Sequence, residues 1–201
     1  NITLPTFKLN DMPQQHARIQ HEAEPKEGYI SKLIAQGEHQ QLDFKFGVND
    51  SRKIARTLAA FANTDGGRLL IGVKDNGSIA GVRSEEEFYM LQAASEMFTR
   101  PAVPFEVKEW TINQKRVLEV IVPAIKGVLH SAPVEKDNYL IYIRVKDENY
   151  TVNSVWLKAY KWRNSPSGTF IRFGENEKFL LDYLEKEPGI TQSKYCKLAK
   201  I

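Results

Sequence analysis

The sequence of 201 residues contains a single cysteine, Cys196. One cysteine excludes an internal disulfide framework and is typical of a protein in a reducing compartment. The four histidines do not gather around it in the sequence, so we expect no structural zinc site.

Long apolar runs are also missing. The longest, "RLLIGV" and "VLEVIVPAI", have the length of strands and fall well short of the ~20 apolar residues of a membrane-spanning helix. The N-terminus lacks the charged and then apolar pattern of a signal peptide. We therefore expect a cytoplasmic protein without a membrane segment.

A phosphate-binding loop of the P-loop type is absent as well. The stretch "DGGRLLIG" lacks the spacing G-x-x-x-x-G-K-[ST]. Gly66 and Gly67 follow a helix-like run, whereas phosphate groups bind where a helix begins. The two glycines are interpreted as the end of a helix, and hydrolysis of a nucleotide by a P-loop is excluded.

Apolar residues recur with both helical and strand periods. Helices are predicted at 29–36, 51–65, 84–98 and 154–162, and strands at 38–47, 68–73, 105–112, 115–123 and 138–145. In the first strand Leu42, Phe44 and Phe46 alternate with Gln41, Asp43 and Lys45, which predicts a half-buried strand. "KDNG" predicts a hairpin with "SIAGV" as the returning strand. These elements predict a mixed α/β domain over residues 28–165.

The two ends of the chain differ from this domain. Residues 1–27 are polar and contain three prolines, which predicts an N-terminal arm on the surface. Residues 166–201 read as a linker and two helices, with a Pro-Gly turn between them and Thr191 opening the second. We interpret them as the start of a truncated winged-helix or helix-turn-helix domain.

Three carboxylates are candidates for a metal site. Glu38 and Asp43 lie before and within the first strand, and Asp75 follows the strand after the long helix. If those strands are neighbours, the three groups could hold Mg²⁺ or Mn²⁺ and activate water for phosphodiester cleavage. The alternative is that Asp75 shapes its turn and the other two are solvated surface charges.

Cations and aromatic rings alternate near the end of the domain. Such a strip suits a nucleic-acid backbone and its unstacked bases, although the rings could equally be core residues and the lysines solvated. The candidate cations are Arg144, Lys146, Lys158, Lys161 and Arg163, with Arg52, Lys53 and Arg56 of the long helix as a second patch.

The segments "GEHQQLDFKFG" and "IARTLAAFANTDGGRLLIGVKDNGSIAGV" resemble the Schlafen-type AlbA domain, a family also catalogued as DNA-binding or divergent AAA. The family pattern is E-x-x-x-x-E-F-K, an amphipathic helix, A-F-A-N-T-x-G-G, an apolar strand and G-V-D-D-x-G. The resemblance covers approximately residues 28–160 and implies an AlbA-like α/β fold that binds nucleic acid. The later part resembles the version found in bacterial regulators.

Some Schlafen members cut RNA with three carboxylates. By position these correspond to Glu38, Asp43 and Asp75, and Asp43 stands where the family has Glu. The first hypothesis is therefore a DNA-binding module of a bacterial transcriptional regulator, which needs no cofactor and forms a homodimer to match two-fold DNA sites. The alternative is an endoribonuclease dependent on Mg²⁺ or Mn²⁺. A third, weaker hypothesis is a nucleotide-sensing regulatory domain.

Overall fold

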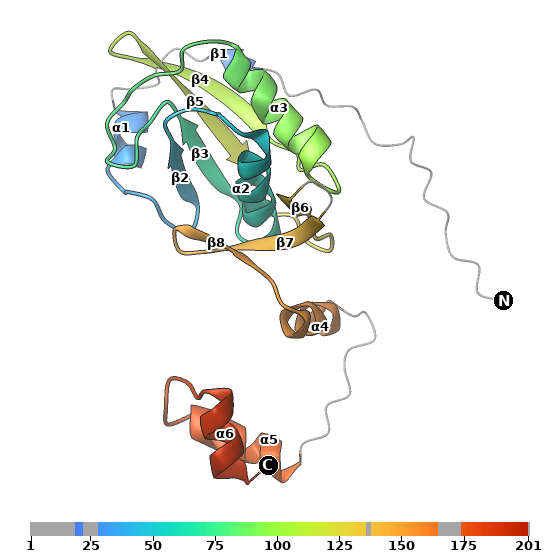
Figure 1. The fold of residues 1–201 in the computed structure, drawn as a ribbon. Coiled ribbons are helices and arrows are strands. Elements are labelled where there is room, and N and C mark those ends of the chain that lie inside the picture. Colours follow the sequence, from blue (N-terminus) through green and yellow to red (C-terminus); the bar gives the residue numbers. More distant parts are fainter. Residues whose placement is uncertain (1–18, 22–27, 136–137, 165–173, 201) are drawn as a thin grey trace, which may run out of the picture. The chain divides into compact units, whose positions relative to one another are not determined.

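A computed structural model describes residues 19–21, 28–135, 138–164 and 174–200 of the chain (Figure 1). The chain divides into two compact units, Asn1–Asn153 and Ser154–Ile201. The described part contains helices and two β-sheets, which confirms the predicted mixed α/β class. Most of the predicted arm (1–27) and the linker 166–173 lie outside the described residues.

The larger sheet of the first unit has five strands in the order β1-β4-β5-β3-β2. β2 and β3 are parallel because helix α2 carries the chain back between them, whereas β3–β5 and β4–β5 are antiparallel. The elements are β1 (Ile19–His21), β2 (Leu42–Lys45), α2 (Ser51–Asn63), β3 (Gly67–Ile71), β4 (Glu106–Ile112) and β5 (Lys115–Val122).

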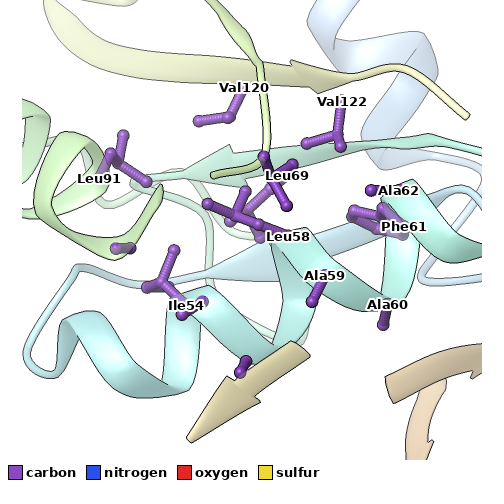
Figure 2. Packing of buried hydrophobic residues seen from close by; sticks show 14 of the residues in the cluster. Ile54, Leu58, Ala59, Ala60, Phe61, Ala62, Leu69, Leu91, Val120 and Val122 are labelled. Carbon is purple, nitrogen blue, oxygen red and sulfur yellow. The ribbon is translucent and has the colours of Figure 1, made fainter. Parts of the chain in front are cut away.

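Helix α2 packs between this sheet and a second sheet of three antiparallel strands, β6 (Ser131–Glu135), β7 (Asn138–Val145) and β8 (Glu148–Thr151). Helix α3 (Glu86–Phe98) lies beside α2. Because α2 is covered from two sides, even its small residues are buried. Figure 2 shows the resulting core, in which Leu58 and Phe61 of α2 meet Leu69 and Val120 of the large sheet.

A smaller core lies on the opposite face of the large sheet, beneath the short helix α1 (Tyr29–Ile34). It contains Leu42 and Phe44 of β2. It also encloses the fully buried carboxylate of Glu119, which accepts hydrogen bonds from Tyr29 Oη (2.8 Å) and Trp110 Nε1 (2.9 Å) and pairs with Arg68 Nε (3.0 Å). A buried charge with three donors is fully compensated, so we interpret Glu119 as a structural residue.

The segment "FANTDGG" is the junction between α2, β3 and β7. Asn63 donates to the carbonyls of His130 and Tyr142 (both 2.8 Å) and accepts from the His130 amide (2.8 Å). Gly66 ends the helix as predicted: its φ is +69° and its amide bonds Phe61 O (2.9 Å). The motif is therefore explained by folding, without a bound phosphate.

Two regions differ from the sequence-based prediction. The predicted strand "SIAGV" is reduced to a single bridge between Val73 and Ile79, because β2 and β5 already occupy both edges of β3. Within the predicted arm, β1 pairs in parallel with β4; three residues are too few to show a period in the sequence.

The second unit contains α4 (Ser154–Arg163), α5 (Glu175–Leu184) and α6 (Gln192–Ala199). The last two match the predicted helix pair, and Thr191 Oγ1 accepts from the Lys194 amide (3.3 Å) at the start of α6. No residue within these three helices is buried.

Candidate nucleic-acid interface and carboxylate pair

Glu38 and Asp43 lie together at β2, the edge strand of the large sheet. Glu38 Oε1 accepts the amide of Phe44 (2.9 Å). Lys45 Nζ donates to Phe44 O (2.8 Å) and lies 2.8 Å from Asp43 Oδ2. These charged side chains satisfy the backbone groups on the free edge of β2 and thereby protect it from pairing with another strand.

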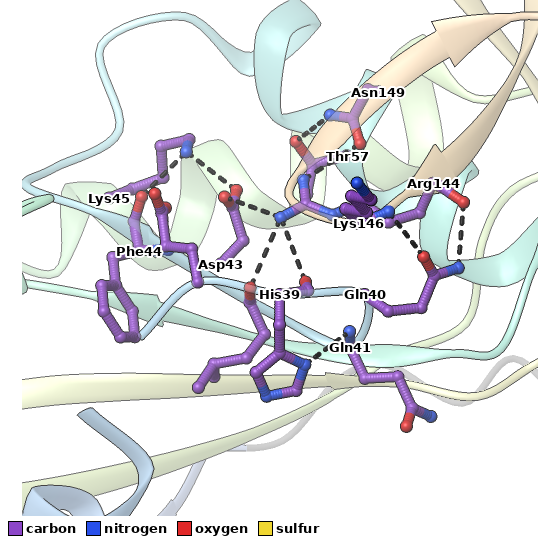
Figure 3. A network of polar contacts seen from close by, with 12 residues as sticks. His39, Gln40, Gln41, Asp43, Phe44, Lys45, Thr57, Arg144, Lys146 and Asn149 are labelled. Atoms are coloured by element: carbon purple, nitrogen blue, oxygen red, sulfur yellow. Dashed lines mark hydrogen bonds and ion pairs between the residues drawn. The ribbon is translucent and has the colours of Figure 1, made fainter. Parts of the chain in front are cut away.

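Arg144 of β7 contacts the same edge of β2, although it lies about a hundred residues later in the sequence (Figure 3). Its guanidinium Nη2 lies 3.2 Å from Asp43 Oδ1 and 3.4 Å from the carbonyls of His39 and Leu42, and Nη1 donates to Asn149 Oδ1 (3.2 Å). The side chain is only 2% exposed. The structure thus places Arg144 in the interior, where it ties the β7–β8 hairpin to β2, and not on the surface that phosphate contact requires.

The turn between β7 and β8 is held against β2 by Gln40 as well. Gln40 Nε2 donates to Arg144 O (2.9 Å) and Asp65 Oδ2 (2.9 Å), and its Oε1 accepts the amide of Lys146 (2.7 Å). Figure 3 shows the contacts of Gln40 with Arg144 and Lys146 beside the Asp43–Arg144 pair. Three of the positions that the sequence marks as catalytic or phosphate-binding, Asp43, Arg144 and Lys146, therefore belong to one polar junction between the two sheets, with Glu38 beside Asp43.

The pKa of the Glu38 carboxyl is raised above its ordinary value. Burial is the main cause, and the neighbouring Asp43 carboxyl adds to it, while the Phe44 amide acts in the opposite direction. Ionisation of Glu38 is therefore disfavoured in the folded chain, beside an Asp43 whose carboxylate pairs with Arg144 and Lys45.

The carboxylate pair does not fit a divalent cation in this arrangement. Mg²⁺ and Mn²⁺ take oxygen ligands with accessible lone pairs. Here Arg144 and Lys45 already place positive charge at the Asp43 carboxylate, and the Phe44 amide bonds Glu38 Oε1. A further cation at Asp43 would be repelled.

Asp75 does not join the other two carboxylates. β2 and β3 are neighbours, as the hypothesis required, but Asp75 lies four residues past the end of β3 in an exposed turn. Across the described ranges no group of three or more His, Cys, Asp and Glu side chains is arranged to hold a metal ion. The ribonuclease hypothesis stays a prediction to which the geometry of the described residues lends no support.

The other candidate cations are distributed over both units. Lys146 is exposed in the β7–β8 turn, and the cations of α4 are exposed on the second unit. In the second patch Arg52 and Lys53 are exposed, but Arg56 donates to the carbonyls of Pro133 (2.8 Å) and Val134 (2.7 Å) and fastens α2 to β6. The exposed cations of α4 are Lys158, Lys161 and Arg163.

One group of residues was not marked by the sequence. Phe46 was predicted to share a buried row with Leu42 and Phe44, but its ring is 47% exposed. Lys74 Nζ and the guanidinium carbon of Arg83 each lie 5.9 Å from the centre of that ring. The available signal was Gly47, which ends the alternating pattern directly after Phe46.

Three comparisons with known proteins bear on the fold. None of the curated proteins compared with the chain matches it. Among solved structures, the DIP2311 protein of Corynebacterium diphtheriae is 20% identical (TM-score 0.48), and the match covers 70% of this chain but 28% of that one. The N-terminal domain of a RecG-related protein of Nitrosomonas europaea is 21% identical (TM-score 0.39), with 62% of this chain and 92% of that domain covered.

Membership of a family rests on the third comparison. The model of the family described as "Schlafen, AlbA_2" matches residues 38–153, which is more than half of the chain. This range begins at Glu38 and ends with the first compact unit, so it contains the β2–α2–β3 unit, both sheets from β2 onward and the polar junction. None of the described helices has the length and apolarity to span a membrane. The chain belongs to the Schlafen, AlbA_2 family.

Proposed function

We propose that the chain is a nucleic-acid-binding module of a bacterial transcriptional regulator, and that it contacts DNA mainly through the phosphate backbone. The observation that carries this proposal is helix α4. Lys158, Lys161 and Arg163 are exposed on a helix in which Trp156 and Tyr160 stack with ring centres 5.3 Å apart and Trp162 is largely exposed. Cations beside flat rings match the charge and the bases of a nucleic acid.

The distribution of charge supports the same surface. Residues 154–201 contain nine Lys and Arg against five Asp and Glu, a net charge of +4, while the chain as a whole carries +3. The first 153 residues are therefore close to neutral. An excess of positive charge confined to one segment is the electrostatic footprint expected of a nucleic-acid-binding region.

Helices α5 and α6 support the proposal through their arrangement. Tyr195 of α6 packs on Phe179 of α5 with ring centres 6.3 Å apart, and Tyr195 Oη donates to Asn176 O (3.1 Å). We propose that this helix pair binds DNA in the manner of a helix-turn-helix motif, in which the second helix enters the major groove. Lys194, Lys197 and Lys200 give that helix exposed positive charge.

The test is the dependence of DNA affinity on salt. Binding of a labelled duplex should weaken steeply from 50 to 200 mM salt, with the logarithm of the binding constant falling by about 0.9 per phosphate neutralised. Replacing Lys158, Lys161 and Arg163 by Gln should lower that slope by roughly two to three. The matched control, Lys178→Gln in α5 with Lys186→Gln just after it, removes charge from the same unit and should change the slope less. An affinity independent of salt would contradict the proposal.

An RNA-cleavage assay with the same protein distinguishes the ribonuclease hypothesis from the proposed function. Single-stranded RNA is incubated with Mn²⁺ or EDTA beside an Asp75→Ala variant. Cleavage that requires Mn²⁺ and is lost in the variant would establish an enzyme with Asp75 in its site. Binding without cleavage, equal in both proteins, is the result that the proposed function predicts.

A further inference from the structure

We propose that Phe46, with Lys74 and Arg83 beside its ring, is a platform on which the chain stacks an unpaired base of single-stranded nucleic acid. The proposal rests on the proposed function for the class of partner, but it concerns the first unit of the chain and a different surface. Phe46, Lys74 and Arg83 are called the Phe46 platform below.

The platform lies where the chain topology gathers loops. β2 and β3 are parallel and in register, with Lys45 opposite Ile71, so the segments that follow them leave the sheet at the same end. Phe46 is the first residue after β2, and Lys74 is the third after β3. In open α/β sheets this carboxyl end of parallel strands is where ligands bind.

The Phe46 ring is far more exposed than the two apolar side chains that precede it in the alternating pattern. Leu42 and Phe44 of β2 are 1% exposed, whereas 47% of Phe46, directly after the strand, is exposed to solvent. A half-exposed aromatic ring with two cations 5.9 Å from its centre has the features of sites that bind unpaired bases, because the ring can stack on the base and the cations attract the adjoining phosphates.

The two cations are available for a ligand. Lys74 and Arg83 side chains form no salt bridge with any other residue of the described ranges. The acidic residues beside them in the sequence are Asp75, next to Lys74, and Glu85, Glu86 and Glu87, which follow Arg83 closely. Glu85 pairs with Arg116 Nη2 (2.5 Å), and Glu87 accepts from the Arg83 amide (3.4 Å). Glu87 also accepts a hydrogen bond from the Ser84 hydroxyl (3.0 Å), so its carboxylate lies at the start of α3.

The loop that carries the cations has a fixed shape. Gly72 (φ +94°) and Gly81 (φ +86°) bring three backbone segments together: Gly81 N bonds Gly72 O (2.9 Å), and Val82 N bonds Arg116 O (2.7 Å). A Cβ on Gly72 would lie 3.0 Å from the backbone of Gly81 and Val82. Because the loop is set before a ligand arrives, less ordering is needed on binding.

A duplex cannot use this platform, since its bases are already stacked on one another. The Phe46 ring therefore selects single strands or unpaired ends, whereas the cations of α4 act on any phosphate backbone. This difference allows the two surfaces to be tested separately in the full 201-residue chain.

The experiment measures affinity by fluorescence anisotropy for three labelled 12-mers: single-stranded DNA, single-stranded RNA and an abasic sugar-phosphate strand of equal charge. Phe46→Ala should weaken binding of the two strands that carry bases by roughly tenfold and leave the abasic strand unchanged. Tyr89→Ala, which removes another exposed aromatic ring of the first unit, is the matched control and should change nothing. Comparison of DNA with RNA shows which sugar the platform accepts.

Phe46→Trp provides a second readout that does not depend on loss of binding. The new indole should retain affinity. Its emission, taken as the difference between the variant and the parent chain with its three tryptophans, should be quenched by strands with bases but not by the abasic strand. Equal losses for all three strands, or no loss, in Phe46→Ala would overturn the platform. If the variant with Lys158, Lys161 and Arg163 replaced by Gln loses affinity and Phe46→Ala does not, the proposed function stands without the platform. If the unmodified chain binds neither duplex DNA nor any of the three strands, both are overturned.

Discussion

At the scale of single residues, the stability of the fold depends on the buried ion pair between Asp43 and Arg144. Both side chains are almost fully buried, and the Arg144 guanidinium also lies 5.2 Å from the centre of the Phe61 ring. Removal of one member of a buried ion pair leaves the other without compensation in a low-dielectric interior. The pair therefore links β2 to β7 only as long as both members are present.

Arg144→Met should destabilise the chain by about 3–5 kcal/mol, because it leaves the buried Asp43 carboxylate without its guanidinium. Chemical denaturation gives the free energy of unfolding. The double variant Arg144→Met, Asp43→Leu should recover a large part of the loss, since neither position then leaves an unpaired charge in the interior. If Arg144 instead served only phosphate binding, the single variant would keep its stability and lose affinity for nucleic acid.

Glu38→Gln tests the raised pKa of the Glu38 carboxyl. A folded-state pKa above the ordinary 4.5 means that ionisation of Glu38 opposes folding, so this carboxyl favours the folded state most at low pH and loses that contribution as pH rises through its folded pKa. Gln keeps an oxygen for the Phe44 amide and carries no charge. At pH 7 the variant should therefore be more stable than the parent by about 1 kcal/mol or less, and the difference should vanish below pH 4.

The control for this substitution is Glu38→Ala, which also removes the acceptor of the Phe44 amide. It should be less stable than Glu38→Gln at every pH, by about 1–3 kcal/mol, because a backbone donor on the edge of β2 is left without its partner. A Glu38→Gln variant that is less stable than the parent at pH 7 would show that the fold favours the ionised carboxyl, which contradicts a raised pKa of Glu38.

At the scale of elements, the β2–α2–β3 unit follows closely from its sequence. Asp50 caps α2 by accepting the Arg52 amide (2.9 Å), and Gly66 ends it, as the pattern predicts. Alternation in 38–47 correctly separates Leu42 and Phe44 from Asp43. The same alternation could not show that Asp43 is buried, because its cover comes from β7, about a hundred residues later.

Phe46 marks the other limit of prediction from sequence. The alternating pattern continues one residue beyond the last residue of β2, so periodicity assigns the Phe46 ring to the core. Whether it is covered depends on where the 72–83 loop goes, and glycines at 72 and 81 direct that loop through contacts distant in sequence. Long-range packing, rather than local preference, decides both cases.

Comparison of Gly66→Ala with Gly127→Ala should separate the cost of backbone strain from the cost of steric conflict at the α2–β3 junction. An added Cβ would lie 2.8 Å from both the Ala124 amide nitrogen and the Val122 carbonyl oxygen, in a conformation with φ of +69°. We expect a loss of about 2–4 kcal/mol in the free energy of unfolding. Gly127→Ala is the matched control: its φ is +83° but no atom lies within 4 Å, so it should lose only about 1 kcal/mol. Equal losses would show that the contact at Gly66 relaxes without cost.

At the scale of the whole molecule, the two units differ in what holds them together. The first unit has two cores on either side of a sheet, and the family model ends at its boundary. The second has no buried residue in its helices, and it carries the excess of positive charge. Stability therefore resides in the family domain, while the proposed duplex-binding charge resides in the segment that follows it.

Hydrogen exchange should report this division directly. Amides of α2, whose side chains are enclosed by two sheets, should open only with global unfolding of the first unit and exchange slowly. Those of α4, α5 and α6 should exchange orders of magnitude faster, because these helices bury no side chain and short helices are marginal in water without packing.

Leu181, Leu184 and Leu198 are exposed on α5 and α6 and would be covered in a homodimer formed through them. Slow exchange in α5 and α6 that becomes fast on dilution would establish such a dimer, whereas fast exchange at all concentrations is the result expected for the unit alone.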